Sequence, residues 1–393
     1  MEKRVAILGS TGSIGKNVLH VIDCLNSLGG QSRYEITALS CHSNVDLLAE
    51  QVRRYKPKFV VVTNPDYFED FRSAFVELGI QVLAGQEGLV EVAENEDIDI
   101  FFSAIVGAAG LRAVLAAAKQ GKRIAIANKE PLVVAGKLLV ETAKENGSEI
   151  IPVDSEHSAI FQALQSGSGN EVSRIILTGS GGPFRGLKAE EIEKVTLEQA
   201  LSHPVWDMGP KITVDSATMM NKALEVIEAS WLFGVGADKI EVLIHPESIV
   251  HSLVEFVDGS MIAQLGMPDM CLPIQYALTY PDRLAGAGEP LRLEQVGNLL
   301  FEKPDFANFR ALSLGFEVAK TGGTAAAVFN AANEAAVSEF LDGRIKFVNI
   351  VELIEHCLDK HNVRREVCLE ELLEADCWAR EEVLSSVKCK AKT

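Results

Sequence analysis

The sequence predicts an α/β fold with an N-terminal parallel-sheet domain, a second α/β catalytic domain with a flexible lid, and a C-terminal α-helical domain. Short β-branched runs alternate with amphipathic stretches over residues 1–150. Mixed strand and helix patterns continue over 151–285, and helical patterns dominate 313–393. A chain of 393 residues is also too long for one ordinary hydrophobic core, so we expect several domains.

Five apolar runs in the first domain are predicted to be strands: 5–8, 36–40, 59–63, 98–105 and 123–128. The segments between them, such as 44–55 and 110–120, have helical spacing. This alternation is typical of a parallel sheet with crossover helices.

The remaining elements are expected in two domains that a linker joins. Strands are expected at 174–179, 211–215, 239–244 and 260–265. Scattered Gly and Pro residues predict a linker over 286–312, and helices are expected at 311–321, 324–341, 348–361 and 368–387.

Composition excludes several kinds of partner. A formal charge of −18 without a long basic run argues against nucleic acids and anionic membranes, although an anionic small molecule remains possible where cations gather locally. The seven cysteines include no C-x-x-C pair, which favours free thiols in a reducing compartment. The N-terminus has too few apolar residues for a secretory signal, and Arg112 interrupts the most apolar tract. We therefore expect a cytoplasmic protein.

A glycine-rich segment follows the first predicted strand. Gly9, Gly12 and Gly15 form G-x-x-G-x-x-G and open a predicted helix. Glycines let the backbone approach a pyrophosphate, and the helix N-terminus offers N–H donors, as in a Rossmann-like domain. The alternative is a plain tight turn.

The turn after the second strand indicates which cofactor is bound. NAD-specific sites usually place an acid there to bind the ribose hydroxyl. Here the turn reads CHSN, so that Ser43 and Asn44 offer neutral donors that a 2′-phosphate would tolerate. NADPH is favoured over NADH.

Two carboxylates crowd the end of another apolar run. Asp154 and Glu156 flank Ser155, and segment 212–234 offers a possible third acid. Such a set either lies on a solvated turn or holds a cation, and acids without cysteine indicate a hard ion, Mg²⁺ or Mn²⁺. His157 is explained equally well as a metal ligand and as a packing or supporting residue.

Segment 212–234 also predicts an anion site. We expect its strand to end at Asp215 and Ser216 to cap a helix over 217–234, which places Asn221, Lys222 and Glu225 on one side. A serine, an amide and an ammonium near a helix N-terminus suit an anion. The alternative for Lys222 and Glu225 is an exposed intrahelical salt bridge.

Three further features belong to the candidate site. The glycine-rich segment 177–186 exposes Ser180 and backbone N–H groups to an anion. Segment 202–211 is predicted to be a lid, with His203 at its hinge and Trp206 and Met208 as apolar covers, although Trp206 could simply anchor the loop. Lys129 ends a strand at the ligand-binding edge of the sheet, where a surface lysine is the alternative.

These segments together resemble a known family. GSTGSIG, ANKE, PVDSEHSAIFQ, LTGSGGPFRG, HPVWDMGPK and VDSATMMNKALEVIEA, in this order, closely resemble 1-deoxy-D-xylulose 5-phosphate reductoisomerase. The resemblance covers nearly the whole chain. It implies a cytoplasmic homodimer of the non-mevalonate isoprenoid pathway, which converts 1-deoxy-D-xylulose 5-phosphate to 2-C-methyl-D-erythritol 4-phosphate with NADPH and a divalent metal.

The resemblance also implies residue roles. The implied metal ligands are Asp154, Glu156 and Glu225. The implied catalytic residues are Lys129, Glu156 and His203. The implied substrate-binding residues are Lys129, Ser155, Glu156, Ser180, His203, Trp206, Ser216, Asn221, Lys222 and Glu225. The implied cofactor-binding residues are Gly9, Thr11, Gly12, Ser13, Ile14, Ser43, Asn44, Asn128, Glu130 and Gly209.

Three positions depart from the forms common in the family, namely Pro131, Pro210 and Ala223, and they bear on loop mobility more than on chemistry. The implied reaction is a skeletal rearrangement, by a retro-aldol/aldol or a ketol route, followed by reduction of the resulting aldehyde. Two rivals remain. Another NADP-dependent sugar-phosphate dehydrogenase would not need three acids, and an NADP-sensing module would need only the glycine loop.

Overall fold

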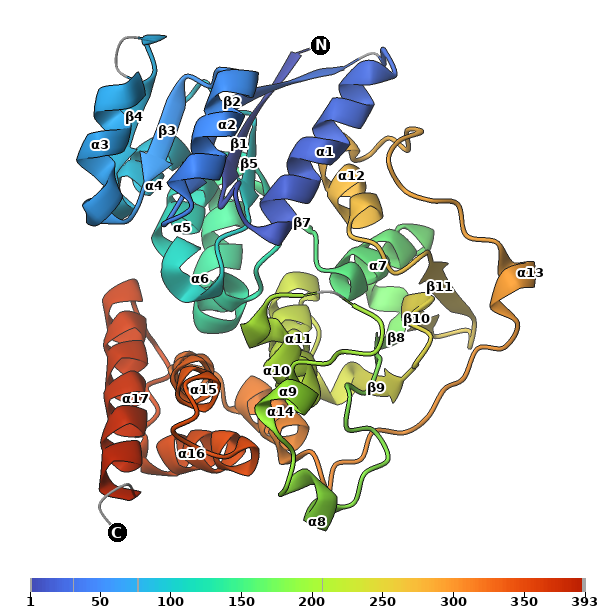
Figure 1. The fold of residues 1–393 in the computed structure, drawn as a ribbon. Coiled ribbons are helices and arrows are strands. Elements are labelled where there is room, and N and C mark those ends of the chain that lie inside the picture. Colours follow the sequence, from blue (N-terminus) through green and yellow to red (C-terminus); the bar gives the residue numbers. More distant parts are fainter. Residues whose placement is uncertain (1, 31, 76–77, 207, 391–393) are drawn as a thin grey trace. The chain divides into compact units, whose positions relative to one another are not determined.

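The computed structural model describes residues 2–30, 32–75, 78–206 and 208–390, which form two compact units (Figure 1). The first unit comprises Met1–Pro131, Leu139–Ser158 and Asp269–Pro290. The second comprises Leu132–Leu138, Ala159–Pro268 and Leu291–Thr393. The predicted four-part division of the chain stays a prediction, whereas the α/β fold class is confirmed.

A parallel sheet forms the centre of the first unit. Among the described residues it has seven strands in the order β4-β3-β2-β1-β5-β6-β7. The strands are β1 (Glu2–Leu8), β2 (Arg33–Cys41), β3 (Phe59–Val62), β4 (Gln81–Ala84), β5 (Ile100–Ser103), β6 (Arg123–Ile126) and β7 (Glu149–Pro152). All five strands predicted for this domain are confirmed, as β1, β2, β3, β5 and β6. Strand order reverses at β1, the position where such sheets bind ligands at their carboxyl ends.

The first unit also contains helices, most of which separate these strands along the chain. They are α1 (Ser13–Ser27), α2 (Val45–Tyr55), α3 (Pro65–Phe75), α4 (Gly85–Glu94), α5 (Leu111–Lys119), α6 (Glu130–Asn146), which both units share, and α12 (Cys271–Thr279), with a 3₁₀ turn at Gly107–Gly110. Because parallel strands are covered on both faces, their sequences are unbroken apolar runs. Residues 5–8 of β1 are accordingly 0% exposed.

The second unit contains a smaller, mixed sheet. Its four strands in the described chain have the order β11-β10-β8-β9, and only β8 and β9 are parallel. The strands are β8 (Val172–Gly179), β9 (Ile240–Ile244), β10 (Val250–Phe256) and β11 (Met261–Leu265). The strands predicted at 174–179, 239–244 and 260–265 are confirmed.

The strand predicted at 211–215 is wrong, because these residues lie in helix α10 (Pro210–Ala217). The alternation of KITVD suggested a strand, but Pro210 occupies the first turn of a helix, where its missing N–H costs nothing. Thr213 Oγ1 donates to the carbonyl oxygen of Gly209 at 2.9 Å. Ser216 therefore lies in the last turn of α10 and caps no helix over 217–234.

The remaining helices of the second unit include those predicted for the C-terminal region. They are α7 (Ser155–Ala163), which begins in the first unit, α8 (Ala189–Ile192), α9 (Leu197–Ala200), α11 (Met220–Phe233), α13 (Leu293–Val296), α14 (Arg310–Thr321), α15 (Ala325–Leu341), α16 (Phe347–Lys360) and α17 (Leu369–Lys390), with 3₁₀ turns at Leu164–Ser166, Gly169–Glu171 and Ala237–Lys239. Helices α15, α16 and α17 pack on one another (Figure 1). No helix of the described residues is long and apolar enough to cross a membrane.

Candidate active site

The glycine-rich loop joins β1 to α1 in the first unit. Gly12 is the N-cap of α1, and among the described side chains none caps this helix. Gly12 and Ser13 are exposed, while Thr11 and Ile14 are half-buried. The free N–H groups of the first turn are thus available to an anion.

The loop needs glycine at two of its positions. A Cβ on Gly15 would lie 2.3 Å from the carbonyl oxygen of Gly9, and Gly9 has a φ of +83°. Ser10, directly after Gly9, is buried and donates to Gln51 Oε1 at 2.7 Å. The backbone is therefore held in a tight turn with no room for a side chain at Gly9 or Gly15. This geometry suits close approach of a phosphate group.

The turn after β2 has the polar, uncharged character that the sequence predicted. His42, Ser43 and Asn44 are exposed, and Asn44 is the N-cap of α2, where its side chain accepts from the N–H of Leu47. Both Ser43 and Asn44 are thus at the surface at the carboxyl end of β2, as a 2′-phosphate site requires.

Lys129 and Asp154 meet at the same edge of the sheet. They follow β6 and β7, and Lys129 Nζ lies 2.5 Å from Asp154 Oδ2. Lys129 is only 6% exposed, so the alternative of a surface lysine is wrong. Neighbouring Asn128 and Glu130 are also buried, and Asn128 Oδ1 accepts from Ser103 Oγ at 2.7 Å.

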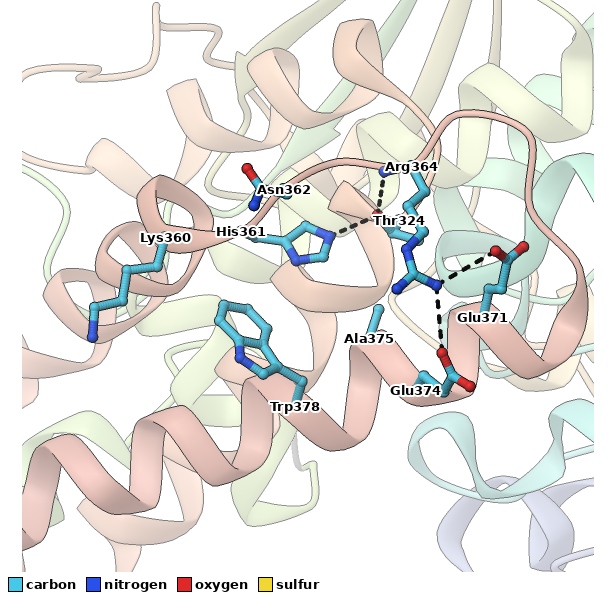
Figure 2. A pocket seen from close by; sticks show the side chains of 9 residues that line it. All are labelled: Thr324, Lys360, His361, Asn362, Arg364, Glu371, Glu374, Ala375 and Trp378. Atoms are coloured by element: carbon cyan, nitrogen blue, oxygen red, sulfur yellow. Dashed lines mark hydrogen bonds and ion pairs between the residues drawn. The ribbon is translucent and has the colours of Figure 1, made fainter.

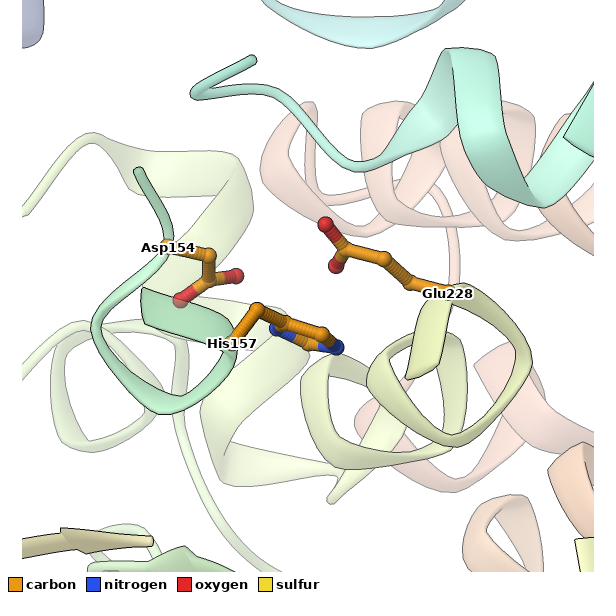
Figure 3. Close-up of side chains that lie close together, drawn as sticks. All are labelled: Asp154, His157 and Glu228. Atoms are coloured by element: carbon orange, nitrogen blue, oxygen red, sulfur yellow. The ribbon is translucent and has the colours of Figure 1, made fainter. Parts of the chain in front are cut away.

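The carboxylates of Asp154 and Glu156 offer oxygen atoms within 4.8 Å of one another. Ser155 Oγ donates to Glu156 Oε2 at 2.5 Å, on the first turn of α7. Figure 3 shows Asp154 in the loop before α7 and His157 on that helix. His157 is 0% exposed. The carboxylate oxygens of Asp154 and Glu156 are hard ligands that suit Mg²⁺ or Mn²⁺.

In the second unit, α11 carries a buried charged cluster. Glu225, which is 0% exposed, accepts from Lys222 Nζ at 2.5 Å and from Asn221 Nδ2 at 2.6 Å. The predicted spacing of these three residues on one side of the helix is confirmed. Lys222 is 4% exposed, so the alternative of an exposed salt bridge is wrong.

Two glycines bring the other predicted anion ligands to this helix. A Cβ on Gly179 would lie 2.8 Å from Lys222 Cε, and one on Gly182 would lie 2.5 Å from the carbonyl oxygen of Ser216. The loop after β8, which carries Ser180, therefore lies against both α10 and α11. We call Ser180, Ser216, Asn221 and Lys222 the phosphate cluster, after the anion site that the sequence predicts for them.

His203 joins the predicted lid to this loop. Its Nδ1 accepts from the N–H groups of Trp206 at 2.9 Å and Val205 at 3.2 Å. The other ring nitrogen, Nε2, must then carry the proton, and it lies 3.0 Å from Ser180 Oγ. Burial lowers the pKa of His203, which favours this neutral form.

Residues 202–206, 208 and 209 of the predicted lid have irregular backbone, whereas Pro210 and Lys211 lie in α10. Trp206 and Met208 are half-buried, Gly209 is exposed, and Asp207 of the predicted lid lies outside the described residues. Trp206 as a ligand cover and Trp206 as a loop anchor both agree with partial burial.

One contact of this region was missed at the sequence level. Asn333 of α15 donates to Asp215 of α10 at 2.9 Å. Asn330 and Asn333 are both 0% exposed within an apolar helix. Two amides three residues apart in such a helix were the available signal, because buried polar groups need partners.

A cavity of about 400 Å³ lies elsewhere in the second unit (Figure 2). Its lining comprises Thr324, Lys360, His361, Asn362, Arg364, Glu371, Glu374, Ala375 and Trp378. None of these is a predicted site residue.

The chain is similar over most of its length to known proteins. The model of 1-deoxy-D-xylulose 5-phosphate reductoisomerase matches residues 5–136, the model of that enzyme's C-terminal domain matches 150–233, and the DXP reductoisomerase C-terminal domain model matches 265–382. The 1-deoxy-D-xylulose 5-phosphate reductoisomerase of Ruminiclostridium cellulolyticum is 49% identical over 380 residues, 97% of this chain and 98% of the relative. The enzyme of the same name from Shouchella clausii is 50% identical over 384 residues, 97% and 99% of the two chains.

Solved structures agree. The Zymomonas mobilis reductoisomerase in complex with NADPH has a TM-score of 0.91 at 42% identity, with 98% of this chain and 99% of that chain covered. A DOX-P reductoisomerase with NADPH, fosmidomycin and magnesium has a TM-score of 0.92 at 40% identity, with 98% of each chain covered. The chain belongs to the 1-deoxy-D-xylulose 5-phosphate reductoisomerase family.

Proposed function

We propose that this protein converts 1-deoxy-D-xylulose 5-phosphate to 2-C-methyl-D-erythritol 4-phosphate by isomerisation and reduction, with NADPH and a divalent metal, in the non-mevalonate isoprenoid pathway. One observation carries the proposal. Asp154 and Glu156 follow β7 of the same parallel sheet whose first turn is the glycine-rich loop. A dehydrogenase that reduces a ready-made carbonyl would need the loop but not the paired acids.

The metal ligands in this proposal are Asp154, Glu156 and Glu225, the three acids that the family resemblance implies. Their support is the chemistry of the donor set, three carboxylates and no thiol, together with the magnesium in solved relatives. When bound, the metal ion would supply Lewis-acid polarisation of the substrate's oxygens and NADPH would supply the hydride.

Lys129 is proposed to hold a reacting oxygen of the substrate. Its ammonium is buried beside Asp154, so it lies where the charge of an oxygen would develop next to the proposed metal ligands. Ser155 would bind the substrate from the first turn of α7, and Glu156 would serve both metal and substrate.

The phosphate cluster is proposed to bind the substrate's phosphate. Lys222 supplies the charge, and the first turn of α11 supplies N–H donors. His203 and Trp206 would close over the bound sugar and exclude water, with His203 Nε2–H as a donor beside Ser180.

NADPH is proposed to bind at the carboxyl edge of the large sheet. The residues assigned to it are Gly9, Thr11, Gly12, Ser13, Ile14, Ser43, Asn44, Asn128, Glu130 and Gly209. The glycine-rich turn and the acid-free turn after β2 support this assignment and the preference for NADPH over NADH.

Two broader proposals accompany this function. The family resemblance supports a homodimer, which sedimentation of the purified protein would test. The seven free cysteines support a reducing, cytoplasmic location.

NADPH consumption tests the function. With 1-deoxy-D-xylulose 5-phosphate, we expect turnover with Mg²⁺ or Mn²⁺ and none with excess EDTA. Glu225→Gln should abolish turnover and leave NADPH binding, followed by fluorescence, nearly unchanged, because the glycine-rich loop belongs to the other unit. Metal-independent reduction would favour an ordinary dehydrogenase, and NADPH binding without turnover would favour a sensing module.

A further inference from the structure

A buried carboxylate in the second unit is not among the residues assigned to the site. Asp215 of α10 is 1% exposed. Its Oδ2 lies 2.8 Å from Lys211 Nζ, and its Oδ1 accepts from Asn333 Nδ2 at 2.9 Å. Asn333 is on α15, 118 residues further along the chain. A C-terminal helix is thus bonded directly to the helix that follows the lid.

Asp215 directly precedes Ser216 of the phosphate cluster, and the turn from α10 into α11 separates Ser216 from Asn221 and Lys222. The Thr218 hydroxyl lies 3.1 Å from the carbonyl oxygen of Val214 and 3.2 Å from that of Asp215, so that the two carbonyls share its proton. The same hydroxyl accepts from the N–H of Met220 at 3.3 Å. Between them Met219 has a φ of +62°, a left-handed conformation unusual for methionine. The turn from α10 into α11 is therefore tightly defined, and Asp215 is its anchor to the C-terminal helices.

Burial makes this anchor sensitive to its partners. A carboxylate removed from water needs hydrogen bonds and a counter-charge. Lys211 supplies the counter-charge, and losing Asn333 would leave the buried Oδ1 without this hydrogen bond. Without Asn333, Asp215 would turn toward water or toward Lys211. In either case α10 would lose its bond to α15, next to Ser216.

We propose that Asn333 is a positioning residue for the phosphate cluster, which it acts on through Asp215 and the turn between α10 and α11. The inference rests on the proposed function for the nature of the ligand, a sugar phosphate. It gives the C-terminal helical region a role in substrate binding, although none of the residues assigned to the site lies in that region.

The chain provides a matched control. Asn330 lies one turn earlier on α15, is also 0% exposed, and also has a buried Oδ1 without a partner among the described residues. Its Nδ2 donates to Glu334 and not to Asp215. Asn330→Leu and Asn333→Leu therefore remove equally buried amides, of which only one holds the anchor.

The test compares the two variants in the full-length protein. Asn333→Leu should weaken binding of inorganic phosphate, measured by calorimetry, and raise the KM for 1-deoxy-D-xylulose 5-phosphate, each by about 10- to 100-fold. The Kd for NADPH should stay unchanged. Asn330→Leu should change phosphate affinity less than about threefold. It should lower Tm by about as much as Asn333→Leu does.

Other outcomes separate this inference from the proposed function. Equal losses of phosphate affinity in the two variants, or no phosphate binding by the wild type, would overturn it. The protein could bind phosphate, with only Asn333→Leu weakening that binding, and yet show no turnover. That result would support the inference about Asn333 and refute the proposed function. If Asn333→Leu does not fold, Asn333→Asp with Asp215→Asn restores an amide–carboxylate bond and should bind phosphate at least about tenfold better than Asn333→Asp alone. If the double variant binds phosphate no better than Asn333→Asp alone, the inference is overturned.

Discussion

Each unit contains a buried lysine–carboxylate pair, and the two pairs are built differently. Lys129 and Asp154 of the first unit, and Lys222 and Glu225 of the second, each have an N···O distance of 2.5 Å. The first pair joins loops that follow two neighbouring strands. The second joins residues three apart on one helix. Asp154 is 15% exposed at its side chain, and Glu225 is 0% exposed.

This difference separates what spacing predicts from what sheet topology creates. The i, i+3 relation of Lys222 and Glu225 is a property of any helix. The contact between Lys129 and Asp154 requires β6 and β7 to be parallel neighbours, so that their carboxyl ends meet. We infer different uses for the two lysines, the first at the reacting oxygens and the second at the remote phosphate. The first of three predictions tests this inference directly, and the other two test neighbouring parts of the site in each unit.

The largest effect is expected from removing the lysine charges. Lys222→Met should lower kcat/KM for the phosphorylated sugar by roughly 30- to 1,000-fold, because one charge-assisted contact contributes about 2–4 kcal/mol to transition-state binding. With the unphosphorylated sugar, wild type and Lys222→Met should be similarly poor. Lys129→Met should instead lower kcat/KM for both sugars by a common factor.

Steady-state kinetics with both sugars measures this contrast, and far-ultraviolet circular dichroism checks that both variants fold. If Lys222→Met lowers both sugars equally, Lys222 acts at the reacting centre or on folding, and the comparison between the pairs fails.

A smaller effect is expected at the glycine-rich loop. In Gly15→Ala the new methyl group would lie 2.3 Å from the carbonyl oxygen of Gly9, so the loop must open. The Kd for NADPH should rise about 10- to 100-fold, since the N–H donors of α1 lose their alignment. Inorganic phosphate, which we assign to the other unit, should bind as before.

Gly30→Ala is the control for this change, because its methyl group would meet no atom within 4 Å. Fluorescence titration should give it the wild-type Kd for NADPH. A Gly15→Ala variant with unchanged NADPH affinity would mean that the cofactor does not approach this turn.

The smallest effect concerns pH. Burial lowers the pKa of His203 below its ordinary value of 6.5. As pH falls through 6.5, His203 binds a proton in the unfolded chain but not in the folded chain. The free energy of unfolding therefore declines until pH reaches the lower pKa of the folded state. In His203→Gln this decline is absent, because glutamine does not titrate. The difference in Tm between wild type and His203→Gln should therefore shift against the wild type between pH 7 and pH 5.5. A constant difference across that range would mean that His203 titrates normally.

Much of the candidate site was predictable because its signals are local. The glycine-rich turn depends on backbone freedom at Gly9 and Gly15, and the α11 cluster depends on helical spacing. The crowding of Asp154 and Glu156 is visible in any reading of the chain, since like charges so close together need an explanation.

Tertiary structure decided the rest. Residues 211–215 alternate like a strand, yet Pro210 at the start of a helix and the burial of Thr213 and Val214 produce α10. Likewise the amide that holds Asp215 comes from α15, and only packing brings the two together. By itself the sequence determined the parallel sheet, its cofactor turn and the residue types of the site, because short-range sterics and hydrophobic period specify them. The burial of Lys129 and Lys222 and the pairing of Lys129 with Asp154 were decided by packing, because desolvation and this contact depend on residues far apart in the chain.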